Sequence, residues 1–186
     1  SKSGWAELAL RRLWEQLKPL GVELNLEKTQ MVNVLKGESF GFLGFDLRRI
    51  PNRNKNGFFV FMIPKKKART TVKAKIRELI QNAGAKPAQD LIKQINVVLT
   101  GWVNYFRVGN SSQAFSEVRD YTEMKIRTLL TRRKRRRKRS IGWQRWSNEY
   151  LYGVMGLYWD WKVQRVSYES VCTLIGLITL LMKFMG

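Results

Sequence analysis

The apolar residues of this 186-residue chain change their spacing at Pro64, and this change constrains the fold more than any other feature of the sequence. Before Pro64, the apolar run from Phe40 to Leu47 is typical of one β-strand, and turn residues over 51–57 favour a hairpin across 41–63. After Pro64, apolar residues recur every three or four positions, as in amphipathic helices. The sequence therefore predicts an α+β fold, with short antiparallel strands followed by helices.

Three helices are expected between residues 64 and 138. Gly84 ends the first helix, Pro87 opens the second at a favoured first-turn position, and the third runs into a block of basic residues. A further helix is expected from Trp5 to Leu17. Residues 141–186 are expected to be helical and aromatic. The predicted core residues of the three helices are Val72, Ile76, Leu79, Ile80 and Ala83, then Leu91, Ile92, Ile95, Leu99, Trp102, Val103 and Phe106, then Phe115, Val118, Thr122, Ile126, Leu129 and Leu130.

Positive charge is concentrated in the middle of the chain. The formal net charge is +21, from 35 basic and 14 acidic residues. Residues 64–140 hold 21 of the basic and 5 of the acidic residues, so +16 of the charge lies in 77 residues. A surface that only keeps a protein soluble would spread its charge, whereas a face that binds a polyanion concentrates it.

Several chemistries are excluded by composition. The chain has no His and one Cys, Cys172, so it offers no His general base, no Ser–His triad, no intrachain disulfide and no zinc cluster. Its aspartates are scattered over different predicted elements, so no metal site and no catalytic residue is expected from the sequence itself. The longest apolar run, 171–182, is too short to span a bilayer, so no membrane partner is expected; the role of this tail is left open.

Two basic clusters are candidate nucleic-acid ligands. One follows Pro64, and the other is a run of eight consecutive cations. Cations that neutralise phosphates release counterions, which makes binding depend on salt. The alternatives are solvated helix faces or, for the run of eight, a sorting signal. The candidate residues are Lys65, Lys66, Lys67, Arg69, Lys73 and Arg77, and then Arg132, Arg133, Lys134, Arg135, Arg136, Arg137, Lys138 and Arg139.

An aromatic stretch, Gly101-Trp102-Val103-Asn104-Tyr105-Phe106, lies at the end of the second predicted helix. Trp102 and Phe106 continue the apolar stripe, so they are expected to pack in the core. Tyr105 falls off that stripe, and it is a candidate to stack on a nucleic-acid base.

Ordered motifs over residues 20–165 resemble those of a known family. Residues 20–29 (LGVELNLEKT), followed by Gly41-Phe42-Leu43-Gly44-Phe45, resemble the last two palm motifs of bacterial reverse transcriptases. Residues 91–96 (LIKQIN) and 101–107 (GWVNYFR) resemble the maturase-specific region of group II intron proteins. Asp120-Tyr121 and the later arginines with Trp143 fit the same family. The chain thus resembles the C-terminal part of a group II intron-encoded reverse transcriptase/maturase.

The resemblance implies a layout of domains. Residues 1–63 would be the end of the palm with a primer-grip hairpin, residues 64–138 the helical thumb or domain X, and residues 139–186 a basic-to-aromatic, DNA-binding-like region. Lys28 would lie near the incoming nucleotide, Phe42, Leu43 and Gly44 would form the primer grip, and Arg107 would join the nucleic-acid ligands. The family's Tyr-x-Asp-Asp motif would belong upstream of Ser1, so catalysis is not assigned to this chain.

The resemblance also implies partners. These would be group II intron RNA, an RNA/DNA template–primer and the N-terminal fingers and palm of the same protein. No cofactor is expected in this chain, although the complete polymerase would need Mg²⁺. The alternatives are a stand-alone RNA-binding splicing factor of the same family, or a non-intron reverse transcriptase associated with defence or CRISPR. A cytoplasmic or organellar location is expected, because the chain opens without a signal peptide.

Overall fold

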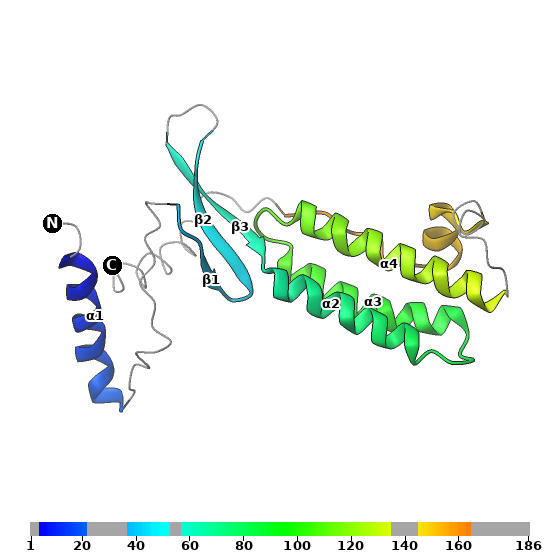
Figure 1. Cartoon of the computed structure of the whole chain (residues 1–186), viewed down its shortest axis with the longest axis horizontal. Helices are drawn as coiled ribbons and strands as arrows, with labels where there is room; N and C mark the ends of the chain where they lie inside the picture. The colour runs from blue at the N-terminus through cyan, green and yellow to red at the C-terminus, as the bar shows by residue number, and fades with distance from the viewer. Residues whose placement is uncertain (1–3, 22–36, 53–56, 135–144, 165–186) are drawn as a thin grey trace. The chain divides into compact units, whose positions relative to one another are not determined.

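The computed structural model of the chain describes residues 4–21, 37–52, 57–134 and 145–164. Strands precede three long helices along the chain, so the predicted α+β class is confirmed (Figure 1). The elements in order are α1 (Gly4–Leu17), η1 (Lys18–Leu20), β1 (Phe40–Phe42), β2 (Phe45–Pro51), β3 (Phe58–Pro64), α2 (Lys66–Gln81), α3 (Ala88–Phe106), α4 (Ser112–Arg133) and η3 (Tyr150–Val154).

The chain divides into two compact units. The first contains α1, which begins one residue before the predicted helix and ends at the predicted residue, Leu17. The short helix η1 follows, and after it Gly21 adopts a left-handed conformation and donates its N–H to Lys18 O at 3.2 Å. The second is formed by Gly41–Leu47 and Phe59–Gln164, and it contains the candidate site.

The sheet has three antiparallel strands in the order β1-β2-β3. The sequence predicts one strand over 40–47, but the structure breaks it at Leu43 and Gly44, which form a two-residue turn with φ values of +44° and +78°. Two consecutive positive φ values are what a tight hairpin turn requires, and glycine adopts them without strain. The apolar pattern alone could not reveal this turn.

Helices α2, α3 and α4 run alongside one another and form the core predicted from their apolar spacing (Figure 1). The buried residues come from all three helices: Val72 and Ile76 of α2; Leu91, Ile92, Ile95 and Leu99 of α3; and Val118, Ile126 and Leu130 of α4. Helix α2 packs against both of the others. None of the helices described is long and apolar enough to cross a membrane.

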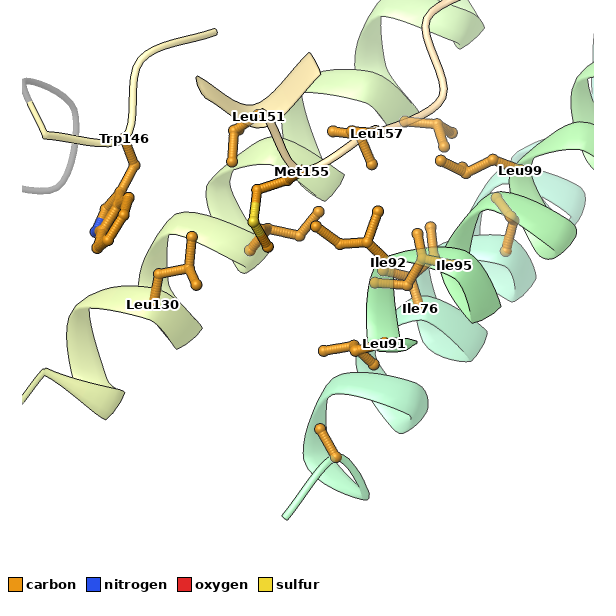
Figure 2. Close-up of a cluster of buried hydrophobic side chains, with 14 residues drawn as sticks. Ile76, Leu91, Ile92, Ile95, Leu99, Leu130, Trp146, Leu151, Met155 and Leu157 are labelled. Carbon is orange, nitrogen blue, oxygen red and sulfur yellow. The ribbon is translucent and has the colours of Figure 1, made fainter. Parts of the chain in front are cut away.

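The segment after α4 completes this core. Figure 2 shows Trp146, Leu151, Met155 and Leu157 directed at the same cluster as the side chains of the three helices. Between residues 147 and 164, helical structure is limited to residues 148–154, and a segment without regular secondary structure follows. The predicted helix does not continue there.

Asn96 of α3 holds this irregular segment. Its side-chain N–H donates to Gly156 O at 2.7 Å, and its side-chain oxygen accepts from Tyr158 N–H at 2.9 Å. One side-chain amide therefore both donates to and accepts from the backbone of this segment. It satisfies two backbone polar groups that would be paired within a helix if the segment were helical.

The loop between α3 and α4 is fastened to β3 by Asn110. Asn110 N–H donates to Met62 O at 2.7 Å, and its side-chain oxygen accepts from Met62 N–H at 3.2 Å. Gly109 has a φ of +86°, and a Cβ there would lie 2.8 Å from Met62 O, so only glycine fits this approach. The sequence predicts a helix break at this place, and the structure adds its function as an anchor for the strand.

Candidate nucleic-acid interface

The first predicted basic cluster lies on α2 and just before it. Lys66, Lys67 and Arg77 are exposed, and no acidic residue in the described part of the chain pairs with them. Lys66 and Arg77 lie on the same helix face, because they are separated by three turns. Lys65 precedes the helix, and its ammonium lies over the backbone of Gly41 in β1. These cations are available to a polyanion.

Arg69 and Lys73 are engaged within the protein. Both form ion pairs with the carboxylate of Glu117 on α4. Their side chains are 26% and 23% exposed, so part of each still faces solvent. The hydrogen bond from Lys73, followed by that from Arg69, lowers the pKa of Glu117 below its usual value, although burial opposes this shift. These two predicted ligands therefore also join α2 to α4.

Tyr121 of α4 lies between two cations. The ammonium nitrogens of Lys73 and Lys125 are 5.5 and 5.4 Å from the centre of its ring. Such contacts hold cations in place through the ring's negative face. The basic surface thus extends from α2 onto α4.

The second predicted cluster begins in the last turn of α4. Arg132, Arg133 and Lys134 are exposed. Arg133 donates to Gly84 O at 3.1 Å, and the ammonium of Lys134 lies 5.8 Å from the ring centre of Trp146. The remaining candidates of this cluster and the predicted nucleotide-proximal lysine lie outside the described residues; these are Arg135, Arg136, Arg137, Lys138, Arg139 and Lys28.

The predicted primer-grip residues form the β1–β2 turn. Leu43 is 62% exposed at its tip. Its carbonyl accepts a hydrogen bond from Tyr105 Oη at 2.9 Å, and Gly44 O accepts one from Lys65 N–H at 2.8 Å. Two bonds from outside the sheet therefore fix the turn against α3 and the start of α2.

Tyr105 is placed on the edge of an aromatic cluster. Its ring stacks against Phe45 with a centroid separation of 6.2 Å and meets Phe106 edge-on at 4.8 Å. The side chain is nevertheless 53% exposed, so part of the ring faces solvent beside the turn. Trp102 and Phe106 pack against the core, as the sequence predicts.

Arg107 is committed to internal contacts. Its guanidinium donates to Asp160 Oδ2 at 2.8 Å and to Tyr158 Oη at 3.0 Å, and its side chain is only 15% exposed. The hydrogen bond from Arg107 lowers the pKa of Asp160. Since these bonds fasten the C-terminal segment to the end of α3, Arg107 is not included in the interface proposed below.

A buried polar network next to the basic end of α4 was not anticipated from the sequence. The Arg127 guanidinium donates to Glu123 Oε2 at 3.0 Å and to Trp146 O at 2.8 Å, and it also bonds to Asn148. Tyr152 Oη donates to the other oxygen of Glu123 at 2.6 Å. Burial, followed by this hydrogen bond, raises the pKa of Tyr152. An arginine and a glutamate four residues apart resemble an ordinary surface pair, so only tertiary structure reveals this network.

No group of three His, Cys, Asp or Glu side chains that could hold a metal ion occurs among the residues the structure describes. The arrangement is therefore a basic helical surface with a fixed, exposed turn beside it. Such a surface can neutralise phosphates and contact a nucleic-acid backbone.

A family comparison agrees with this geometry. Residues 69–159 match the family described as group II intron, maturase-specific domain. The match begins in α2 and ends in the segment that completes the core. A search of the curated proteins gave no match. Residues 69–159 therefore form a group II intron maturase-specific domain, which supports a maturase role in intron splicing.

Proposed function

We propose that this protein is the C-terminal portion of a group II intron reverse transcriptase/maturase, which binds intron RNA and an RNA/DNA template–primer. In this proposal, the exposed cations of α2 and the end of α4 contact the phosphate backbone. They assist intron splicing and RNA-templated DNA synthesis by holding the nucleic acid.

One observation carries this proposal. The exposed cations Lys66, Arg77 and Arg132 have no ion-pair partner in the described ranges, and they lie within or beside the maturase-specific match. Cations that serve only a folded core are paired, as Arg107 and Arg127 are here. Unpaired cations repel one another unless a polyanion neutralises them. A-form RNA is recognised largely through its shape and backbone, which suits a basic helical surface.

The β1–β2 turn is the proposed primer grip. Leu43 projects from a turn that Tyr105 and Lys65 hold in place, and Gly44 lets this turn lie close against the rings of Phe106 and Tyr105. A fixed backbone turn of this kind can support the end of a primer strand. The described residues offer no site that fits the Mg²⁺ of a complete polymerase, so we assign no catalytic step to them.

The test is RNA binding by a triple variant, Lys66→Ala, Arg77→Ala and Arg132→Ala. Each phosphate contact contributes about 0.7–0.9 to the slope of log K against log salt, so the slope should fall by roughly two. A matched triple variant, Lys86→Ala, Lys93→Ala and Lys162→Ala, removes the same charge from exposed lysines elsewhere. Equal slopes for the two triple variants would overturn the proposed interface.

A further inference from the structure

A cleft of about 480 Å³ lies between α2 and α3, next to the β1–β2 turn. This volume is within the range of pockets that hold small molecules or parts of larger ones. Its wall on α2 is formed by residues one helical turn apart. The lining residues are Gly44, Lys65, Lys67, Ala68, Thr71, Val72, Lys75, Val98, Trp102 and Phe106.

The charged residues of the cleft are all positive. Its lining includes three lysines and no acidic residue. Lys75 pairs with Glu78 at 3.0 Å, whereas Lys65 and Lys67 have no acidic partner within the described segments. Helix α2 begins at Lys66 with no acidic residue in its first turn, so the positive end of its dipole reinforces the two lysines. This end of the cleft therefore favours an anion.

The remaining wall is apolar and partly aromatic. Val72, Val98 and Phe106 contribute apolar surface, and Trp102 adds an indole. The indole N–H of Trp102 is buried, so it is the ring rather than the N–H that an occupant of the cleft would meet. A purely aliphatic occupant would leave the lysines unused.

A wall of this kind beside two lysines suits a flat ring that is joined to an anion, and a nucleotide has both parts. We propose that the cleft receives one unstacked nucleotide of a single-stranded RNA segment, with its base against Trp102 and Val98 and its phosphate at Lys65 and Lys67. This inference rests on the proposed RNA-binding function and extends it. Single-stranded segments can present an unstacked base, whereas a base within a duplex is stacked and paired.

The test compares two neighbouring threonines of α2. Thr71 lines the cleft, and Thr71→Phe fills it. Thr70 is equally exposed but does not line the cleft, so Thr70→Phe is the matched control. Binding of a 12-nucleotide single-stranded RNA and of a blunt RNA duplex is measured for both variants and for the wild type. We expect Thr71→Phe to weaken single-strand binding about tenfold, with duplex binding unchanged within twofold, and Thr70→Phe to change neither.

A second experiment measures nucleotide binding in the cleft without RNA, so its result does not depend on the exposed cations of the proposed interface. In protein labelled with nitrogen-15 at tryptophan, adenosine 5′-monophosphate should shift the indole N–H resonance of Trp102, and Thr71→Phe should abolish that shift. If Thr71→Phe leaves single-strand binding unchanged, or weakens both RNAs equally, the cleft does not take an unstacked base. If the wild type binds neither RNA, the proposed function fails as well, and the nucleotide titration then shows whether the cleft alone accepts a nucleotide.

Discussion

Arg127 shows how a single cation of this basic protein is used for structure. Its side chain and that of Glu123 are 3% and 5% exposed, and together they tie α4 to Trp146, Asn148 and Tyr152. We expect Arg127→Ala to lower the free energy of unfolding by about 3–5 kcal/mol, because it leaves the Glu123 carboxylate buried without its partner. Chemical denaturation would measure this loss.

The control for Arg127 is Arg119→Ala, which removes a more distant and 40% exposed partner of the same carboxylate, 3.9 Å from Glu123 Oε1. Its loss should change the unfolding free energy by less than about 1 kcal/mol. A double variant, Arg127→Met with Glu123→Leu, should recover much of the stability, because no charge is then left buried. Equal effects of the two arginine substitutions would contradict the structural role.

Glu117 makes the contact between α2 and α4 dependent on pH. Its pKa in the folded state lies below the usual value of 4.5, so its contribution to stability is present above that pH and is lost as the pH falls through the lowered value. The carboxylate is 40% exposed, so the contribution is about 1 kcal/mol or less. We expect Glu117→Gln to melt below the wild type at pH 7, with the difference disappearing as the pH is lowered below 4.5. A difference that stays constant over this range would contradict the ion-pair explanation.

At the scale of elements, the β1–β2 turn depends on Gly44. A Cβ at this position would lie 3.3 Å from Phe106 Cζ, and the backbone has a φ of +78°. We therefore expect Gly44→Ala to cost about 1–2 kcal/mol and to loosen the turn. Thermal melting measures the cost, and Gly101→Ala on α3, where an added Cβ meets nothing within 4 Å, is the control. A Gly44→Ala variant that is as stable as Gly101→Ala would show that the turn tolerates a side chain.

The basic run of residues 132–139 begins in the last turn of α4. We expect neutralisation of four arginines within residues 132–139 to weaken RNA binding for every sequence tested and to flatten its salt dependence, because phosphate contacts do not distinguish sequences. Titrations at several salt concentrations would check this. An unchanged slope would show that the run does not contact phosphates.

Helical periodicity predicted α2, α3 and α4 well, because their apolar residues follow a single period and are mutually buried. Ile76, Ile95 and Ile126 are examples, each 0% or 1% exposed. Gly84 and Pro87 also marked the connection between α2 and α3, although α2 ends at Gln81 and Pro87 precedes the first residue of α3.

Three features could not be predicted, since each depends on residues distant in the sequence. The turn at Leu43 is fixed by Tyr105, which lies 62 residues away. The segment after η3 is not helical, because the side chain of Asn96 forms hydrogen bonds with the backbone of Gly156 and Tyr158. No local sequence pattern reveals this pairing. Three candidate ligands also form ion pairs that the sequence does not reveal. Arg69 and Lys73 pair with Glu117, and Arg107 pairs with Asp160.

At the scale of the whole molecule, charge and core occupy the same region of sequence. Most of the net charge lies in residues 64–140. The same residues include α2, α3 and α4, which supply most of the core, and only the segment after α4 adds to the core from outside this range. We expect the chain to bind a structured group II intron RNA more tightly than a length-matched control RNA, and to retain that preference when salt is raised. Filter binding at two salt concentrations would show this. Equal binding that falls steeply with salt would mean that the basic surface holds phosphates without selecting an intron.

The hydrogen bonds of Asn96 to Gly156 and Tyr158 also bear on the order of folding during synthesis. The helices α2, α3 and α4 are complete at Arg133, but their shared core still lacks Leu151, Met155 and Leu157. A nascent chain that has only just released α4 from the ribosome therefore lacks the side chains that complete the core of these helices. Closure of the core waits for about 25 more residues, so we expect the three helices to reach their full stability only after Leu157 has emerged.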